Sequence, residues 1–247
     1  MINTSVNKMN RGFTLVEVLL ALAIGTFIMA AVLTAVMQGY SSSSGIEQSV
    51  AVQEDVRAAL DIMSHEIAMA SYASNPSASS IWRTTAGGCP LCDDLTTCTY
   101  KGIQEATASA LTIEMDTAVP ENLTIGDANE IIRYEYLPGK QMVTRATGCP
   151  NVSLAQPFLS ADSASTSAKA RNVAVTNGTR NIPLFQYYDG TGAEILPAAL
   201  PARIPDIRRI KITVAVQATV PDFKGQMREM IYSTSVMVRN HAPITSK

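Results

Sequence analysis

Glu17 is the ionisable side chain that most needs an explanation in this sequence, because it stands at the start of a long apolar segment. From Val18 to Ile46 the chain has no Asp, Glu, Lys or Arg, a run of 29 residues. A helix needs about 20 apolar residues to cross a bilayer. A carboxylate within such a helix costs a few kcal/mol or more, so it is usually paired and usually functional. The spacing therefore predicts a membrane-length helix whose carboxylate has a partner.

The charges that precede the apolar segment predict its orientation. Lys8 and Arg11 are the charged residues before Glu17, and no acidic residue stands among residues 1–12. Basic residues flanking a membrane span stay on the cytoplasmic side. Everything after about residue 42 is therefore expected on the side of the membrane away from the cytoplasm.

Four cysteines form the second set of residues with chemical potential: Cys89, Cys92, Cys98 and Cys149. An even number of cysteines in an oxidising compartment predicts disulfides. A Cys89–Cys92 bridge would enclose two residues, a loop more typical of redox catalysts. We favour a bridge from Cys149 to Cys89 or Cys92, with Cys98 taking the remaining one. A zinc site is the alternative to disulfide bonds, but the C-x-x-C pair has no matching second pair of ligands.

The rest of the sequence shows no catalytic pattern. His65 and His241 are the only histidines, and neither has a nucleophile partner in a recognisable motif. Asp93-Asp94 and residues 127–130 could supply oxygens to calcium, but turn formation explains them better. No nucleotide-binding loop or basic stretch is present. We therefore expect no enzyme activity, no cofactor, no metal and no nucleic-acid partner.

Periodicity predicts one helix from Phe13 to about Ser74, with any kink between Gly39 and Gly45. Asn75-Pro76 ends it, because Pro disfavours a helical conformation in the residue before it. In its second half, apolar residues recur mostly every three or four positions, as on one face of a helix: Ile46, Val50, Val52, Val56, Leu60, Met63, Ile67 and Ala70.

The chain beyond Pro76 is typical of strands and turns. Segments 130–136 and 140–145 flank Leu137-Pro138-Gly139, a hairpin signal. Other strands are expected at 111–115, at 184–188 before a turn at Asp189-Gly190, and in a closing hairpin from 207–220 and 228–239. Residues 160–169, rich in Ser and Ala, resemble a surface loop. The sequence thus predicts an α+β fold with antiparallel sheet packed on a long helix.

The segment Arg11-Gly12-Phe13-Thr14-Leu15-Val16-Glu17 resembles the prepilin signature of type IV pilins and type II secretion pseudopilins. In that family a short basic leader ends in Gly, and a prepilin peptidase cleaves after it. The new N-terminal Phe is N-methylated, and Glu is the fifth residue of the mature chain. The resemblance implies cleavage between Gly12 and Phe13, methylation of Phe13, and an assembly role for Glu17.

A looser resemblance links the second half of the chain to the minor pilins called PilW and the pseudopilins called PulJ. It rests on Arg57-Ala58-Ala59-Leu60 with Glu66-Ile67, on Ile132-Arg133-Tyr134, and on the closing Val238-Arg239-Asn240. These strand patterns have low specificity, and the four cysteines belong to no pattern that can be carried over.

Together the resemblances imply three regions: a leader at 1–12, a transmembrane and assembly helix at 13–45, and a periplasmic pilin-like domain at 46–247. They imply a bacterial inner-membrane protein that joins a pilus or pseudopilus. Its expected role is that of a minor pilin that initiates or caps assembly of a type IV pilus. Its expected partners are the prepilin peptidase, the major pilin and other minor subunits. A minor pseudopilin of a type II secretion system, a tip adhesin using Gly87 to Cys98, and a membrane-tethered enzyme are the alternatives.

The cysteine pattern generates the first prediction. In protein from its native compartment, Cys149 should be covalently joined to the Cys89–Cys98 segment. Such a bridge closes a loop of roughly 50 to 60 residues, which stabilises the fold by about 4 kcal/mol in the loop-entropy model. Peptide mapping without reductant should detect the cross-linked peptide. Four free thiols, or one zinc ion per chain released by a chelator, would contradict it.

Overall fold

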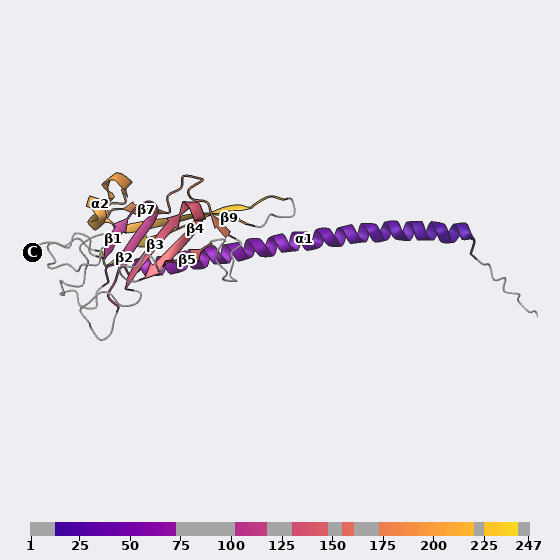
Figure 1. Cartoon of the computed structure of the whole chain (residues 1–247), viewed down its shortest axis with the longest axis horizontal. Coiled ribbons are helices and arrows are strands. Elements are labelled where there is room, and N and C mark those ends of the chain that lie inside the picture. Colours follow the sequence, from indigo (N-terminus) through magenta and orange to yellow (C-terminus); the bar gives the residue numbers. More distant parts are fainter. Residues whose placement is uncertain are drawn as a thin grey trace, which may run out of the picture. The chain divides into compact units, whose positions relative to one another are not determined.

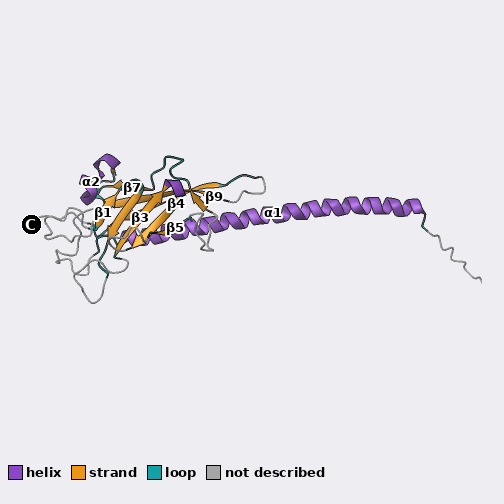
Figure 2. Ribbon diagram, viewed as in Figure 1, coloured by secondary structure: helices purple, strands orange, loops and turns teal. Residues whose placement is uncertain are grey.

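The fold combines one long helix with antiparallel sheets, as the sequence predicts. The computed structural model describes residues 13–72, 102–117, 130–147, 155–160, 173–219 and 225–241. Helix α1, Leu15–Ala68, precedes all the strands in the chain (Figures 1 and 2). The chain divides into two compact units, Met1–Ile46 and Glu47–Lys247, and the strands all belong to the second.

The second half of α1 supplies one wall of the hydrophobic core. Its buried residues follow one helical face, mostly with steps of three or four: Val52, Val56, Ala59, Leu60, Met63 and Ile67, followed by Ala70 just past the helix end. Each buried Val, Leu, Ile or Met side chain contributes about 1.5–3 kcal/mol. The sequence placed the start of this buried face at Ile46, which was wrong, because Ile46 is 58% exposed and Val50 is 46% exposed. Burial starts at Val52, which is the first residue of this helical face to belong to the hydrophobic core. The strands supply the rest of that core.

The first sheet is a meander of five antiparallel strands in the order β1-β2-β3-β4-β5. The strands are β1, Ile103–Ala106; β2, Ala110–Glu114; β3, Ile131–Leu137; β4, Met142–Thr147; and β5, Gln156–Leu159. A short 3-10 helix, η2 at Pro138–Lys140, joins β3 to β4, and Gln141 leaves it with a positive φ of 50°. This confirms the hairpin that Leu137-Pro138-Gly139 predicts.

The second sheet is built around β9, Arg209–Ala218, the longest strand. On one side β9 pairs with β10, Glu229–Met237, over nine consecutive residue pairs. On the other side it pairs first with β7, Phe185–Tyr188, and further along with β6, Val173–Val175. The two-residue β8, Glu194–Ile195, completes the order β10-β9-β7-β8. Between β8 and β9 lie η4, Pro197–Ala199; α2, Leu200–Arg203; and η5, Ile204–Asp206.

Most of the strands expected from the sequence are confirmed. The hairpin of β9 and β10 forms as predicted, and Met230, Tyr232, Val236 and Val238 face inward from its second arm. The turn at Asp189 also forms, because its carboxylate accepts hydrogen bonds from the backbone of Thr191 and Ala193. The Thr191 hydroxyl and these contacts hold the pKa of Asp189 at about 2. The predicted Ser-rich loop lies outside the described residues beyond Ser160.

Asn177 fills the gap between β6 and β7 on β9. Its side-chain Nδ2 donates to the carbonyl of Thr213 at 2.7 Å, and its Oδ1 accepts from the backbone N–H of Ala215 at 2.8 Å. The same Nδ2 donates to the carbonyl of Ile182 at 3.2 Å. Asn177 is fully buried. One amide group therefore replaces the backbone of a neighbouring strand where β6 ends and β7 has not yet begun.

A polar clamp fastens the end of α1 to the first sheet. The Glu66 carboxylate accepts two hydrogen bonds from Arg145 of β4, at 3.1 Å from Nε and 2.7 Å from Nη2. It also accepts a hydrogen bond from the hydroxyl of Tyr134 on β3. Burial and the Glu66 carboxylate raise the pKa of Tyr134 well above its usual value, so the hydroxyl remains a donor. This clamp fixes the rotation of α1 against the sheet.

Asn177→Ala tests how much the side-chain bridge stabilises the fold. The substitution leaves the Thr213 carbonyl and the Ala215 N–H buried without partners, so it should lower the free energy of unfolding by about 3 kcal/mol. Urea unfolding of the full chain in detergent micelles measures the change. Asn240→Ala is the matched control, because Asn240 is exposed and should change stability by less than about 0.5 kcal/mol. Equal effects of the two substitutions would show that the bridge is not stabilising.

Candidate assembly site at the helix N-terminus

Thr14 and Glu17 cap the N-terminus of α1. The Glu17 N–H donates to the Thr14 hydroxyl at 3.3 Å, and the Thr14 N–H points back to Glu17 Oε2 at 3.5 Å. This is the reciprocal capping box of a Thr-x-x-Glu sequence, which satisfies two N–H groups that the helix itself leaves open. The carboxylate also lies at the positive end of the helix dipole. Glu17 thus caps its own helix, a role that its charge alone does not reveal. The spacing of Thr14 and Glu17 could have indicated this role.

The first part of α1 exposes its apolar side chains on every side. Every residue from Phe13 to Tyr40 is exposed, including Phe13 at 83%, Leu15 at 77% and Phe27 at 78%. The helix has the length and apolar composition needed to cross a membrane. An exposed apolar surface of this size marks an interaction site with lipid or protein.

Two hydroxyl groups inside this apolar segment are bonded within the helix. Thr26 donates to the carbonyl of Ala23 at 2.9 Å, and Thr34 donates to the carbonyl of Ala31 at 2.8 Å. Polar groups in lipid must find partners inside the protein. These two threonines therefore add no unsatisfied donor to the segment, and Glu17 remains the only formal charge between Phe13 and Ile46.

Several residues singled out from the sequence cannot be placed. Gly12 and the rest of the leader lie outside the described residues, as do the cysteines at 89, 92, 98 and 149. The adhesin candidate, Gly87 to Cys98, lies outside them too. The expected cleavage bond therefore joins the first described residue, Phe13, to the segment before it.

His241 has a partner that the sequence does not reveal. Its Nδ1 lies 2.8 Å from the hydroxyl of Ser71, 170 residues earlier in the chain, and its Nε2 lies 2.9 Å from the carbonyl of Ile204. A carbonyl can only accept, so Nε2 carries a proton, and in the neutral imidazole Nδ1 accepts from Ser71. Both side chains are buried, at 2% and 3% exposure. The pair joins the end of α1 to the chain after β10, whereas His65 is exposed.

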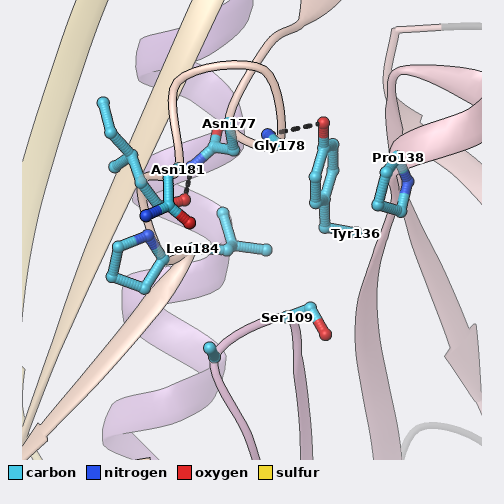
Figure 3. Close-up of a pocket in the computed structure, with 10 residues that line it drawn as sticks. Ser109, Tyr136, Pro138, Asn177, Gly178, Asn181 and Leu184 are labelled. Carbon is cyan, nitrogen blue, oxygen red and sulfur yellow. Dashed lines mark hydrogen bonds between the residues drawn. The ribbon is translucent and has the colours of Figure 1, made fainter.

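A shallow cleft of about 250 Å³ lies where the β1–β2 turn, the end of β3 and the segment after β6 meet (Figure 3). The Tyr136 hydroxyl donates to the carbonyl of Val175 and accepts from the N–H of Gly178 at 2.9 Å. Asn177, which also lines it, makes the bridging contacts described above. These polar groups are committed to the fold, so the cleft shows no arrangement suited to catalysis.

Carboxylates are buried where β2 ends and β3 begins, but they do not form a metal site among the described residues. Glu114 accepts from Gln104 Nε2 at 2.9 Å, and Glu130, one of the calcium candidates, accepts from the N–H of Thr117 at 3.3 Å. The other candidates, Asp93, Asp94, Asp127 and Asn129, lie outside the described residues.

Comparison with known proteins bears on the N-terminal segment. Residues 7–33 match the family model described as the prokaryotic N-terminal methylation motif. No curated protein and no solved structure gave a match to the chain. The matched segment contains Phe13, the capping box and the start of the exposed apolar helix, and it points to a structural protein anchored in the inner membrane. Taken with the long helix and the antiparallel sheets, the motif supports a type IV prepilin-like protein.

Proposed function

We propose that this protein is a minor pilin, a structural subunit that helps to initiate or cap the assembly of a type IV pilus. The observation that carries the proposal is the exposed apolar part of α1 with Glu17 in its first turn. Lipid covers this surface before assembly, and the corresponding helices of other subunits cover it afterwards. The prepilin peptidase removes residues 1–12, which gives Phe13 a free amine that is then methylated.

The capping box supports a two-stage role for Glu17. In the separate subunit, the Glu17 carboxylate rests at the helix N-terminus, where the dipole and the Thr14 N–H stabilise the charge. In the filament, the methylated amine of Phe13 on a neighbouring subunit is a full positive charge in a medium of low dielectric constant. That pairing is much stronger than the capping contact. Assembly thus exchanges a weak intrachain contact for a strong contact between subunits, which sets their axial register.

The sheets and the second half of α1 form the periplasmic domain in this proposal. The basic leader keeps residues 1–12 on the cytoplasmic side, and the domain after about residue 46 lies in the periplasm. Its partners are the major pilin and other minor pilins, which it contacts through α1. A minor pseudopilin of a type II secretion system would use the same surfaces, and the genes beside this one would distinguish the two systems.

The first test of this proposal concerns processing. Mass spectrometry of the mature protein from its own host should show an N-terminal N-methylated Phe13. The peptidase can reach the Gly12–Phe13 bond because it precedes the apolar segment at the membrane surface. An intact leader, or cleavage after residue 30, would refute the prepilin-type processing.

The second test separates the charge of Glu17 from its capping role. Glu17→Gln keeps a side chain that can complete a capping box but removes the charge. Thr14→Ala removes the cap, at about 1 kcal/mol of helix stability, and keeps the charge. If the charge directs assembly, Glu17→Gln should abolish recovery of the protein in sheared filaments or tip complexes, as should Glu17→Ala. Thr14→Ala should assemble nearly normally.

Membrane level and leader processing of each variant provide the controls for this test. All three variants should insert into the membrane, and loss of the charge should make insertion slightly easier because its desolvation cost disappears. Normal incorporation of Glu17→Gln at normal protein levels would rule out the charge as an assembly determinant. A defect confined to Thr14→Ala would assign the role to the helix cap instead.

A further inference from the structure

Strand β10 is a long sheet edge with unused hydrogen-bonding groups. The Ala218 N–H donates to the carbonyl of Arg228, and the Val238 N–H donates to the carbonyl of Arg208. In an antiparallel ladder, pairs that exchange hydrogen bonds alternate with pairs that do not. The even-numbered residues of β10 therefore bond to β9. The backbone N–H and C=O groups of 229, 231, 233, 235 and 237 point away from it, and no hydrogen bond to them is present among the described residues.

The other sheet edges in the described part of the chain are protected. Strand β1 has four residues and an irregular register, and β5 contains Pro157 and a register shift. Strand β8 has two residues, and β6 has three. Short strands, bulges and Pro are the features that keep edges from pairing with other chains. Strand β10 has none of them, since its nine pairs with β9 are regular.

The side chains along this edge also favour pairing. The outward residues carry their side chains on the exposed face, where Ile231 is 55% exposed and Met237 is 64% exposed. Ser233 and Ser235 lie between them. The one charge in the strand, Glu229, is paired with Arg180. Beyond this neutralised pair at its first residue, the strand would present an incoming segment with an uncharged row of small and apolar side chains. The Lys and unpaired Glu that natural edges use to repel strands are absent from residues 230–237.

We infer that the β10 edge binds an extended, uncharged segment of a different protein, which adds a strand to the second sheet. Main-chain groups would supply the affinity, and alternate side chains over Ile231, Ser233 and Met237 would supply the specificity. The β10 edge belongs to the folded domain and not to the apolar part of α1. It would provide a second contact in either a pilus or a pseudopilus.

The direction of β10 argues against a second copy of this chain as the partner. Just before β10, Arg228 donates a hydrogen bond to Ser49 of α1 at 3.2 Å. Just after β10, His241 contacts Ser71, which follows the end of α1. Strand β10 therefore runs parallel to the second half of α1. Two copies that pair through the same β10 edge make an isologous contact, which closes a dimer in either strand direction, and antiparallel pairing would also set the two domains head to tail. The subunits of a filament repeat in one direction and do not form closed pairs. The exclusion of a second copy therefore rests on the proposed function, whereas the observation that the β10 edge is unpaired does not.

The test uses the full chain in its own host, with the photoreactive residue p-benzoylphenylalanine in place of Ser235. Ultraviolet light should join it to one discrete protein, and mass spectrometry should place the link in a segment of alternating uncharged residues. Ser233→Pro removes an outward N–H and leaves the ladder to β9 intact, which is the setting in which a sheet tolerates Pro. It should lower the yield of the cross-link at least about fivefold.

Two further variants keep the test decisive. Ser233→Thr is the matched control and should preserve the cross-link. Ile231→Lys places a charge on the exposed face without touching the ladder, and it should lower the yield as Ser233→Pro does. The melting temperatures of all variants should stay within a few degrees of the parent protein. If Ser233→Pro unfolds the domain, the result for Ile231→Lys decides.

Each remaining outcome overturns the inference. A yield unchanged by Ile231→Lys, or the absence of a discrete product, would show that β10 pairs with no other strand. A product made of two copies of this chain would overturn the choice of partner. Leader processing at Phe13 is measured in the same cells, so a failure of the proposed function can be distinguished from a failure of this inference.

Discussion

The structure depends on one constraint: α1 carries apolar side chains over far more surface than its own domain can cover. The sheets bury only the face that begins at Val52, and all residues from Phe13 to Tyr40 remain exposed. In water such a surface would drive aggregation, so it requires lipid or other subunits. A domain that folds on one part of a helix and leaves the rest for a second environment is suited to a subunit that moves from a membrane into an assembly.

The polar groups of the helix follow from the same constraint. Thr26 and Thr34 bond to carbonyls of their own helix, and Thr14 and Glu17 cap each other at its start. Each arrangement satisfies a polar group locally, which matters where water is absent. Glu66, further along the same helix, is satisfied through tertiary contacts with Arg145 and Tyr134. Two carboxylates on one helix thus have different partners, because one lies outside the folded domain and the other inside it.

Buried polar contacts join the parts of the domain that hydrophobic burial leaves loosely defined. Asn177 completes the β9 ladder, and the Tyr187 hydroxyl of β7 donates to the carbonyl of Thr107, in the turn between β1 and β2, at 2.8 Å. The Ser71–His241 pair ties the end of α1 to the chain after β10. Unlike apolar contacts, such bonds have a required direction, so each permits one arrangement of its neighbours and penalises the others.

The sequence by itself determined the long helix, although α1 ends at Ala68 and not at the predicted Ser74. It also determined the apolar segment, the hairpins around Gly139 and between 209 and 237, and the resemblance at residues 11–17. These features depend on periodicity, turn residues and a short motif, which are local. The division into two sheets, the partners of Glu66 and His241, and the role of Asn177 could not be read from the chain. They depend on contacts between residues that are 36 to 170 positions apart. No local pattern encodes which distant groups meet, because the packing of the whole core decides it. The unprotected edge of β10 likewise became visible only when the order of the strands was known.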